Sequence, residues 1–257
     1  MLKKILLAAS CAVSLSAFGA TETWSFEDFS RDFYDYGNSF SGTSGSGIGL
    51  NLTGWSNTGS GESIEDAYLD YADGNGLTLM NRDEWPIYPD HGIDNSNYLP
   101  GYNDYDMVLL SFDTAVNLAG FSLGWAYEYR NGRDRAGRHA DVSVLAYNGA
   151  DAPVLAGSTW NDVADLASGW TSEAQVYDAD DYAYQAISSS TESKYWLIGA
   201  YNPVFGGSGQ YAGNDAFKLA GVQAEPGAQP VNSVPEPGTV LLFAAGLFGI
   251  ALRTRKR

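Results

Sequence analysis

Short runs of alternating or continuous apolar residues recur along the chain up to Ala224, separated by Gly, Asn, Asp and Pro. Alternation with a period of two puts every second side chain on the same face of an extended strand. Aromatic and β-branched residues in such runs, bounded by turn-forming residues, predict strands. The runs lie at 23–26, 48–52, 77–80, 107–112, 116–127, 142–147, 195–201 and 216–222.

This pattern predicts an all-β fold, and the number of short strands favours an antiparallel β-sandwich of the jelly-roll type. Two stretches are short helix candidates, 62–71 and 159–168. In the second, Ser158 or Thr159 can cap the helix, and Val163 and Leu166 recur at helical spacing. Neither stretch is long enough to change the fold class.

A different pattern occupies residues 239–252, which are apolar almost without interruption. A helix there satisfies its own backbone hydrogen bonds, as lipid requires, but reaches only about 20 Å of the ~30 Å hydrocarbon core. This length indicates a transient sorting anchor, with a buried core helix as the alternative. The basic residues that follow keep the tail cytoplasmic and leave the upstream chain outside: Arg253, Arg255, Lys256 and Arg257.

The N-terminus also indicates export. Lys3 and Lys4 precede an apolar stretch at 5–15, and small residues follow at 16–20. This is the order of segments in a signal peptide, with cleavage after Gly19 or after Ala20. A lipoprotein signal at Cys11, the alternative, would leave too few apolar residues before the cysteine.

Between the predicted anchor and the upstream chain lies a short motif, Val234, Pro235, Glu236, Pro237 and Gly238. With the signal peptide, the apolar run and the basic tail, it resembles the PEP-CTERM sorting signal of Gram-negative bacteria that make extracellular polysaccharide. The resemblance implies that an exosortase, a membrane protease, cuts near this motif. It also implies release of the upstream domain to the cell surface or the extracellular matrix.

Four interior segments resemble exosortase-dependent surface proteins with a jelly-roll-like domain, which have no established enzymatic activity. They are His91-Gly-Ile-Asp-Asn95, the run 106–112, Gly124-Trp125 and the run 141–147. The Arg-rich segment 126–140 is longer than that pattern leads us to expect. The patterns along the chain together predict a signal peptide at 1–20, a β-sandwich at 21–224, a linker at 225–233 and the sorting signal at 234–257.

The mature chain is strongly acidic. Six of the 14 Lys and Arg residues and only Glu236 of the 31 Asp and Glu residues fall in the removed segments. The remaining 8 bases and 30 acids give a net charge of about −22, which repels nucleic acid. Without Cys11 no disulfide forms, so a packed core, with or without a bound ion, must supply the stability.

Few residues suit catalysis. His91 and His139 are the only histidines, and no Gly-x-Ser-x-Gly motif occurs. We expect His91 to make loop hydrogen bonds and His139 to be solvated. The chain is therefore expected to be non-enzymatic, structural or associated with extracellular polysaccharide. The alternatives are a secreted carbohydrate-active enzyme, which needs only two suitably spaced carboxylates, and a permanently membrane-tethered protein.

Two kinds of ligand have candidate residues. Clustered carboxylates at Asp178, Asp180 and Asp181 are the candidates for a structural Ca²⁺, although no EF-hand template is present and an ordinary acidic surface is the alternative. Tryptophan faces stack on sugar rings, and three lie in polar, Gly-rich or Pro-rich surroundings: Trp55, Trp85 and Trp160. Trp125 and Trp196 lie in apolar runs and are expected in the core.

Overall fold

The computed structural model describes residues 20–27, 37–57, 63–82, 92–95, 104–130, 134–207 and 213–227, with backbone only at 130 and 134–136. Most of the predicted signal peptide, Trp85, His91 and the whole sorting motif lie outside these residues. The predicted membrane helix at 239–252 lies outside them as well. The described residues therefore belong to the domain that ends at Gly227.

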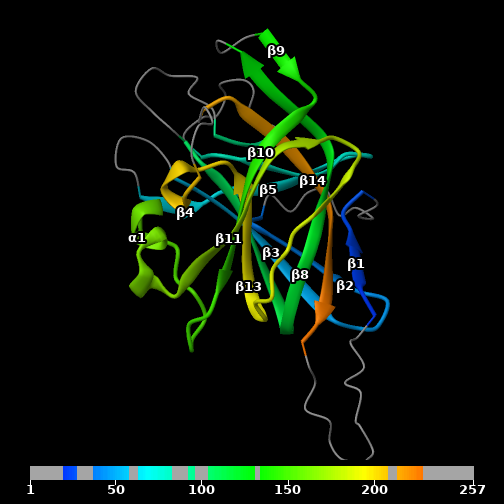
Figure 1. The fold of residues 1–257 in the computed structure, drawn as a ribbon, viewed down its shortest axis with the longest axis vertical. Helices are drawn as coiled ribbons and strands as arrows, with labels where there is room; N and C mark the ends of the chain where they lie inside the picture. The colour runs from blue at the N-terminus through cyan, green and yellow to red at the C-terminus, as the bar shows by residue number, and fades with distance from the viewer. Residues whose placement is uncertain are drawn as a thin grey trace, which may run out of the picture. The chain divides into compact units, whose positions relative to one another are not determined.

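The described chain is predominantly antiparallel β structure (Figure 1), which confirms the predicted β class. Every named ladder is antiparallel, and the ladders connect all the described strands into one network. The finer expectation of a jelly-roll-like sandwich stays a prediction. The strands are β1 Glu22–Ser25, β2 Ser39–Thr43, β3 Gly49–Asn57, β4 Ile64–Asp66, β5 Tyr68–Ala72, β6 Gly76–Met80, β7 Ile93–Asp94, β8 Asp106–Arg130, β9 Asp134–Gly137, β10 His139–Tyr147, β11 Trp170–Asp180, β12 Tyr184–Ala186, β13 Ser193–Ala200 and β14 Asp215–Pro226.

The long strand β8 organises the network. Its first half pairs with β3 and β13, and β13 continues to β10 and β11. Its second half pairs with β14, β12 and β9, while β14 pairs on its other side with β1, β6 and β7. Bulges interrupt the β13 and β14 ladders, and such bulges let strands bend and twist. Figure 1 shows β8 running the length of the domain between β13 and β14.

The core consists of two clusters on opposite faces of the first half of β8. Val108 and Leu110 belong to the larger cluster, whereas Met107 and Leu109 belong to the smaller one. Alternate side chains of a strand point to opposite faces, so both faces are buried here and the sequence is apolar without interruption. The smaller cluster packs beneath the helix α1, Trp160–Ala164.

The structure corrects one helix candidate and confirms the other. Residues 64–66 and 68–72 form β4 and β5 instead of a helix. In β5, every second side chain is buried, as in a strand with one face toward the core. The second candidate forms α1, where the Thr159 side chain accepts from the Asp162 N–H, followed by the short 3-10 helix η2, Leu166–Ser168. A further 3-10 turn, η3, spans Pro203–Phe205 and contacts α1.

Two strand boundaries differ from the sequence pattern. The runs 107–112 and 116–127 join into the single strand β8, since the residues between them continue the extended strand. The last strand, β14, continues to Pro226, which pairs with Val116, and the Gly227 N–H donates to the Ala115 carbonyl. The ladder thus extends past Ala224, where we expected the folded domain to end.

Candidate metal centre

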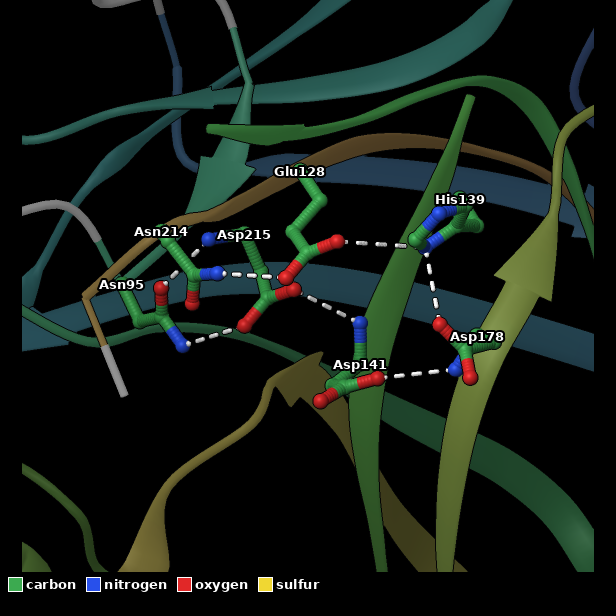
Figure 2. Close-up of polar contacts among 7 residues, drawn as sticks. All are labelled: Asn95, Glu128, His139, Asp141, Asp178, Asn214 and Asp215. Atoms are coloured by element: carbon green, nitrogen blue, oxygen red, sulfur yellow. Dashed lines mark hydrogen bonds and ion pairs between the residues drawn. The ribbon is translucent and has the colours of Figure 1, made fainter. Parts of the chain in front are cut away.

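A cluster of charged and amide side chains lies where the ends of several strands meet (Figure 2). The register of the β8–β14 ladder places Glu128 opposite Asp215, so both side chains lie on the same face of the sheet. The neighbouring strands β10 and β11 bring in the remaining charged groups. The cluster contains Asn95, Glu128, His139, Asp141, Asp178, Asn214 and Asp215.

Asn95 and Asp215 form the buried base of the cluster, with 0% and 1% of their surfaces exposed. Asn95 Nδ2 donates to Asp215 Oδ2 at 3.0 Å, and the Asp215 N–H donates back to Asn95 Oδ1 at 2.9 Å. Asn95 Nδ2 also donates to the Tyr201 carbonyl at 2.7 Å. Buried polar groups are costly unless paired, so these bonds fix the chain after β7 against β14 and the end of β13.

Asp141 links this base to the outer part of the cluster. Its N–H donates to Asp215 Oδ1 at 2.8 Å, and its Oδ1 accepts the Asp178 N–H at 2.8 Å. The β10–β11 register slips by one residue opposite Asp141, which is a β-bulge on β11. Asp178 lies in this bulge with φ of 53°, in the left-handed region that costs a non-glycine residue about 1–2 kcal/mol. The bulge and the Asp141 hydrogen bond hold Asp178 beside His139 (Figure 2).

The outer part of the cluster gathers three potential metal-ligating atoms. His139 Nδ1 lies 3.1 Å from Asp178 Oδ1 and 3.7 Å from Glu128 Oε2. Ligand atoms of all three side chains lie within 4.8 Å of one another. The Asp178 side chain is 72% exposed, whereas those of Glu128 and His139 are partly buried, so one side of the group is open to solvent.

Two neighbours fix the orientation of these ligands. Asn214 is 6% exposed, and its Nδ2 donates to Glu128 Oε1 at 2.8 Å. Gly137 lies against the imidazole, because a Cβ added there would come within 1.9 Å of His139 Nε2. Metal sites commonly have such outer neighbours. A hydrogen bond to a ligating carboxylate and a close contact with a ligating imidazole both fix the orientation of the ligands.

Burial raises the pKa of two carboxyl groups behind this outer part. Desolvation is the main cause for Asp215, whose pKa rises to about 7, and the Asp141 and Glu128 carboxylates add to the rise. Desolvation also raises the pKa of Asp141, with smaller contributions from the charges of Asp178 and Glu128. The N–H donors on both carboxylates oppose the rise, but only in part.

A raised pKa and a nearby second carboxylate would suit acid catalysis, but these two groups are buried. Asp215 and Asp141 are 1% and 8% exposed. Both oxygens of Asp215 already accept N–H groups of the fold. In the described geometry they hold strands together, and the accessible chemistry belongs to Glu128, His139 and Asp178.

Comparison with known families matches residues 233–256 to the PEP-CTERM protein-sorting motif. The chain therefore carries a PEP-CTERM protein-sorting motif at residues 233–256. The match includes Val234, Pro235, Glu236, Pro237 and Gly238, as the sequence predicted, and it covers the basic tail from Arg253 to Lys256. No match was found among curated proteins or solved structures.

The motif implies sorting of this PEP-CTERM protein by an exosortase, a membrane protein, with export toward the cell surface. Within the residues that the structure describes, the helices are too short and too polar to cross a membrane. The segment expected to do so, 239–252, is outside that part of the chain.

Of the three calcium candidates, the structure brings only Asp178 into the cluster of this PEP-CTERM protein. Asp180 is exposed at the end of β11. Asp181 pairs with Arg138 at 2.6 Å. The ligand group thus combines one predicted aspartate with Glu128 and His139, two residues that the sequence analysis did not select.

The tryptophans expected to contact glycans occupy other positions in the described domain. Trp160 is 4% exposed and its Nε1 donates to Asn57 Oδ1 at 3.0 Å, so it is a core residue. Trp55 packs partly buried against the smaller core cluster. Trp85 lies outside the described residues. Trp125, expected in the core, is only partly buried.

Proposed function

We propose that this chain is an exported, non-enzymatic surface protein that an exosortase releases from the inner membrane, and that its β domain acts as a structural or polysaccharide-associated component outside the cell. The observation that carries the proposal is the sorting motif at 233–256, which follows a folded acidic domain ending at Gly227. Before processing, the C-terminal apolar run tethers the chain to the membrane.

Intact-mass analysis of the protein from the native host's cell surface and medium tests the sorting step. A product that starts near Ala20 or Thr21 and ends near Pro235 supports processing at both ends. A surface product that retains Arg257 contradicts release and makes the chain a permanently tethered membrane protein.

Two further aspects of the proposal have structural support. Residues from both halves of β8, such as Leu110 and Phe121, share the larger core with β3 and β14 residues, as two facing layers of a sandwich would. The two carboxyl groups whose pKa is raised, Asp141 and Asp215, are buried and cannot reach a substrate, which favours a non-enzymatic role. Release of soluble sugars from the host's polysaccharide by the purified protein would contradict that role.

Polysaccharide association has a candidate surface near the second half of β8, different from the tryptophans first selected. Trp125 and Tyr127 are partly exposed and meet edge to face at 4.5 Å, and Lys218 Nζ lies 4.3 Å from the Trp125 ring centroid. Tyr182 is 62% exposed, with the Arg138 guanidinium 5.6 Å from its ring. Exposed aromatic faces suit stacking on neutral sugar rings.

Affinity electrophoresis in a gel that contains a neutral polysaccharide tests this surface. Tyr182→Ala is expected to migrate faster than the wild type because it removes an exposed stacking face. Leu166→Ala is the matched control, since Leu166 is 97% exposed and lies elsewhere, on η2. Equal retardation of all three proteins, or none, contradicts binding at this surface.

A further inference from the structure

We propose that Glu128, His139 and Asp178 bind one divalent transition-metal ion of the Zn²⁺ class, in a three-ligand site with an open position toward solvent. The proposal concerns the folded domain alone and does not depend on the sorting or polysaccharide roles. It rests on the spacing of the donor atoms, the buried imidazole nitrogen that lacks a hydrogen-bond partner among the described residues, and the residues that hold the ligands in place.

The distances between donor atoms suit one small ion. Zinc binds imidazole nitrogen and carboxylate oxygen at about 2.0–2.2 Å, so neighbouring ligands of a tetrahedral site lie roughly 3.4 Å apart. The Nδ1 atom of His139 is 3.1 Å from one carboxylate oxygen and 3.7 Å from the other. An ion between these atoms therefore needs only small side-chain adjustments.

The imidazole is not arranged as a simple hydrogen-bond donor to either carboxylate. His139 Nδ1 is buried from solvent and has no hydrogen-bond partner within the described residues, although two oxygens are near. In a neutral ring, the lone pair of this nitrogen can bind a metal ion instead.

A second, independent observation comes from Asn214, which is 6% exposed and directed into the cluster (Figure 2). Its Nδ2 holds Glu128 Oε1, while its Oδ1 is buried without a hydrogen-bond partner among the described residues. An unsatisfied buried carbonyl is unusual in a native fold. A water molecule bound in the cluster would supply the missing donor.

The donor set identifies the class of ion. Calcium takes six to eight oxygen ligands, whereas an imidazole nitrogen with two carboxylates suits zinc and neighbouring transition metals. Asp178 and Glu128 together also bring two carboxylates close to one another. A divalent cation offsets the repulsion among these carboxylates, which a neutral histidine cannot do.

Calorimetric titration of the full-length chain in mild detergent with ZnCl₂, and separately with CaCl₂, tests the assignment. We expect one zinc ion per chain and much weaker calcium binding. Glu128→Gln, His139→Gln and Asp178→Asn are each expected to weaken zinc binding at least tenfold. Asp178 is exposed and asparagine tolerates a positive φ, so Asp178→Asn tests the site even if the other variants fold poorly.

Asp180→Asn is the matched control, because it removes the same charge from the same strand two residues away. Retained zinc binding in Asp180→Asn, together with its loss in Asp178→Asn, supports the site. Equal binding by both variants shows zinc adsorbed on an acidic surface and overturns the proposal. Calcium binding tighter than zinc binding at the same residues overturns the assigned class.

Discussion

The larger apolar core and the polar cluster are adjacent stretches of the same two strands. In the β8–β14 ladder, Phe217 pairs with Ala126, and one step further along the same face Asp215 pairs with Glu128. Phe217 is completely buried in the apolar core, whereas Asp215 is equally buried but hydrogen-bonded to Asn95 and Asp141. The two regions are therefore equally buried. They differ in what offsets the cost of burial, which is apolar packing around Phe217 and hydrogen bonding around Asp215.

This difference predicts different sensitivities. The apolar core gains its stability from removing nonpolar surface from water, which changes little with protons or ions. The polar cluster depends on hydrogen bonds and charge, so it responds to both pH and cations. Variants of the two regions should therefore differ in the conditions that affect them as well as in the free energy of unfolding.

The largest effect is expected in the apolar core. Phe217→Ala should lower the free energy of unfolding by about 3–5 kcal/mol, because it leaves a cavity among fully buried neighbours. Denaturant unfolding at pH 5 and at pH 8 measures this loss, which should be the same at both values. A loss that depends strongly on pH would contradict the separation of the two regions.

The next effect is the pH dependence that Asp215 imposes. Its pKa is about 7 in the fold and near 3.8 in the unfolded chain, so between these values the fold retains a proton that the unfolded chain has lost. Stability from this group is therefore complete below about pH 4, falls as pH rises to 7, and is constant above. The total change is at most about 4 kcal/mol.

Asp215→Asn isolates this contribution because it carries no titrating proton. The difference in unfolding free energy between wild type and variant, measured in chelator, should shrink or reverse as pH rises from 4 to 8. A constant difference over this range would show that Asp215 stays ionised in the fold and would contradict its raised pKa.

A smaller effect is expected at Gly137, which supports the His139 ring but supplies no ligand atom. Gly137→Ala should weaken zinc binding by roughly tenfold, since a methyl group there displaces the His139 ring, while the folded domain remains intact. Calorimetry measures the affinity, and circular dichroism without zinc checks the fold. An unchanged zinc affinity would show that His139 binds the ion without the close contact with Gly137.

The smallest effect is expected at the surface, outside both regions. Leu166→Ala should change the unfolding free energy by less than about 0.5 kcal/mol, because Leu166 is 97% exposed. The same denaturant experiment measures it. A larger loss would mean that this side chain has a partner in the folded protein.

The sequence predicted the strands with strong apolar patterns but missed weaker ones. The runs that became β10 and β14 are almost continuously buried, so their composition alone identifies them. In contrast, most residues of β11 are exposed or partly buried, and pairing with β10 forms the strand. Likewise, β2 consists of Ser, Gly, Thr and one Phe, so its pairing with β3 had no hydrophobic signal.

The candidate site was harder to predict than the fold class. Asp178 was selected because acids cluster around it, but its partners come from other strands. Glu128 and His139 meet it only through the β8–β10–β11 arrangement and the bulge opposite Asp141, which one sequence does not specify. His139 was expected in a solvated loop because it follows an Arg-rich segment, yet it begins β10 and faces two carboxylates.

The polar cluster is expected to bind a metal ion through His139, and NMR of the imidazole nitrogens detects such binding at the atoms concerned. The chain has only two histidines, so a His91→Gln variant leaves His139 as the sole imidazole signal. Zinc should shift its Nδ1 resonance to the value of a metal-bound nitrogen with Nε2 still protonated. If zinc leaves both nitrogen resonances of the imidazole unchanged, His139 does not bind the ion.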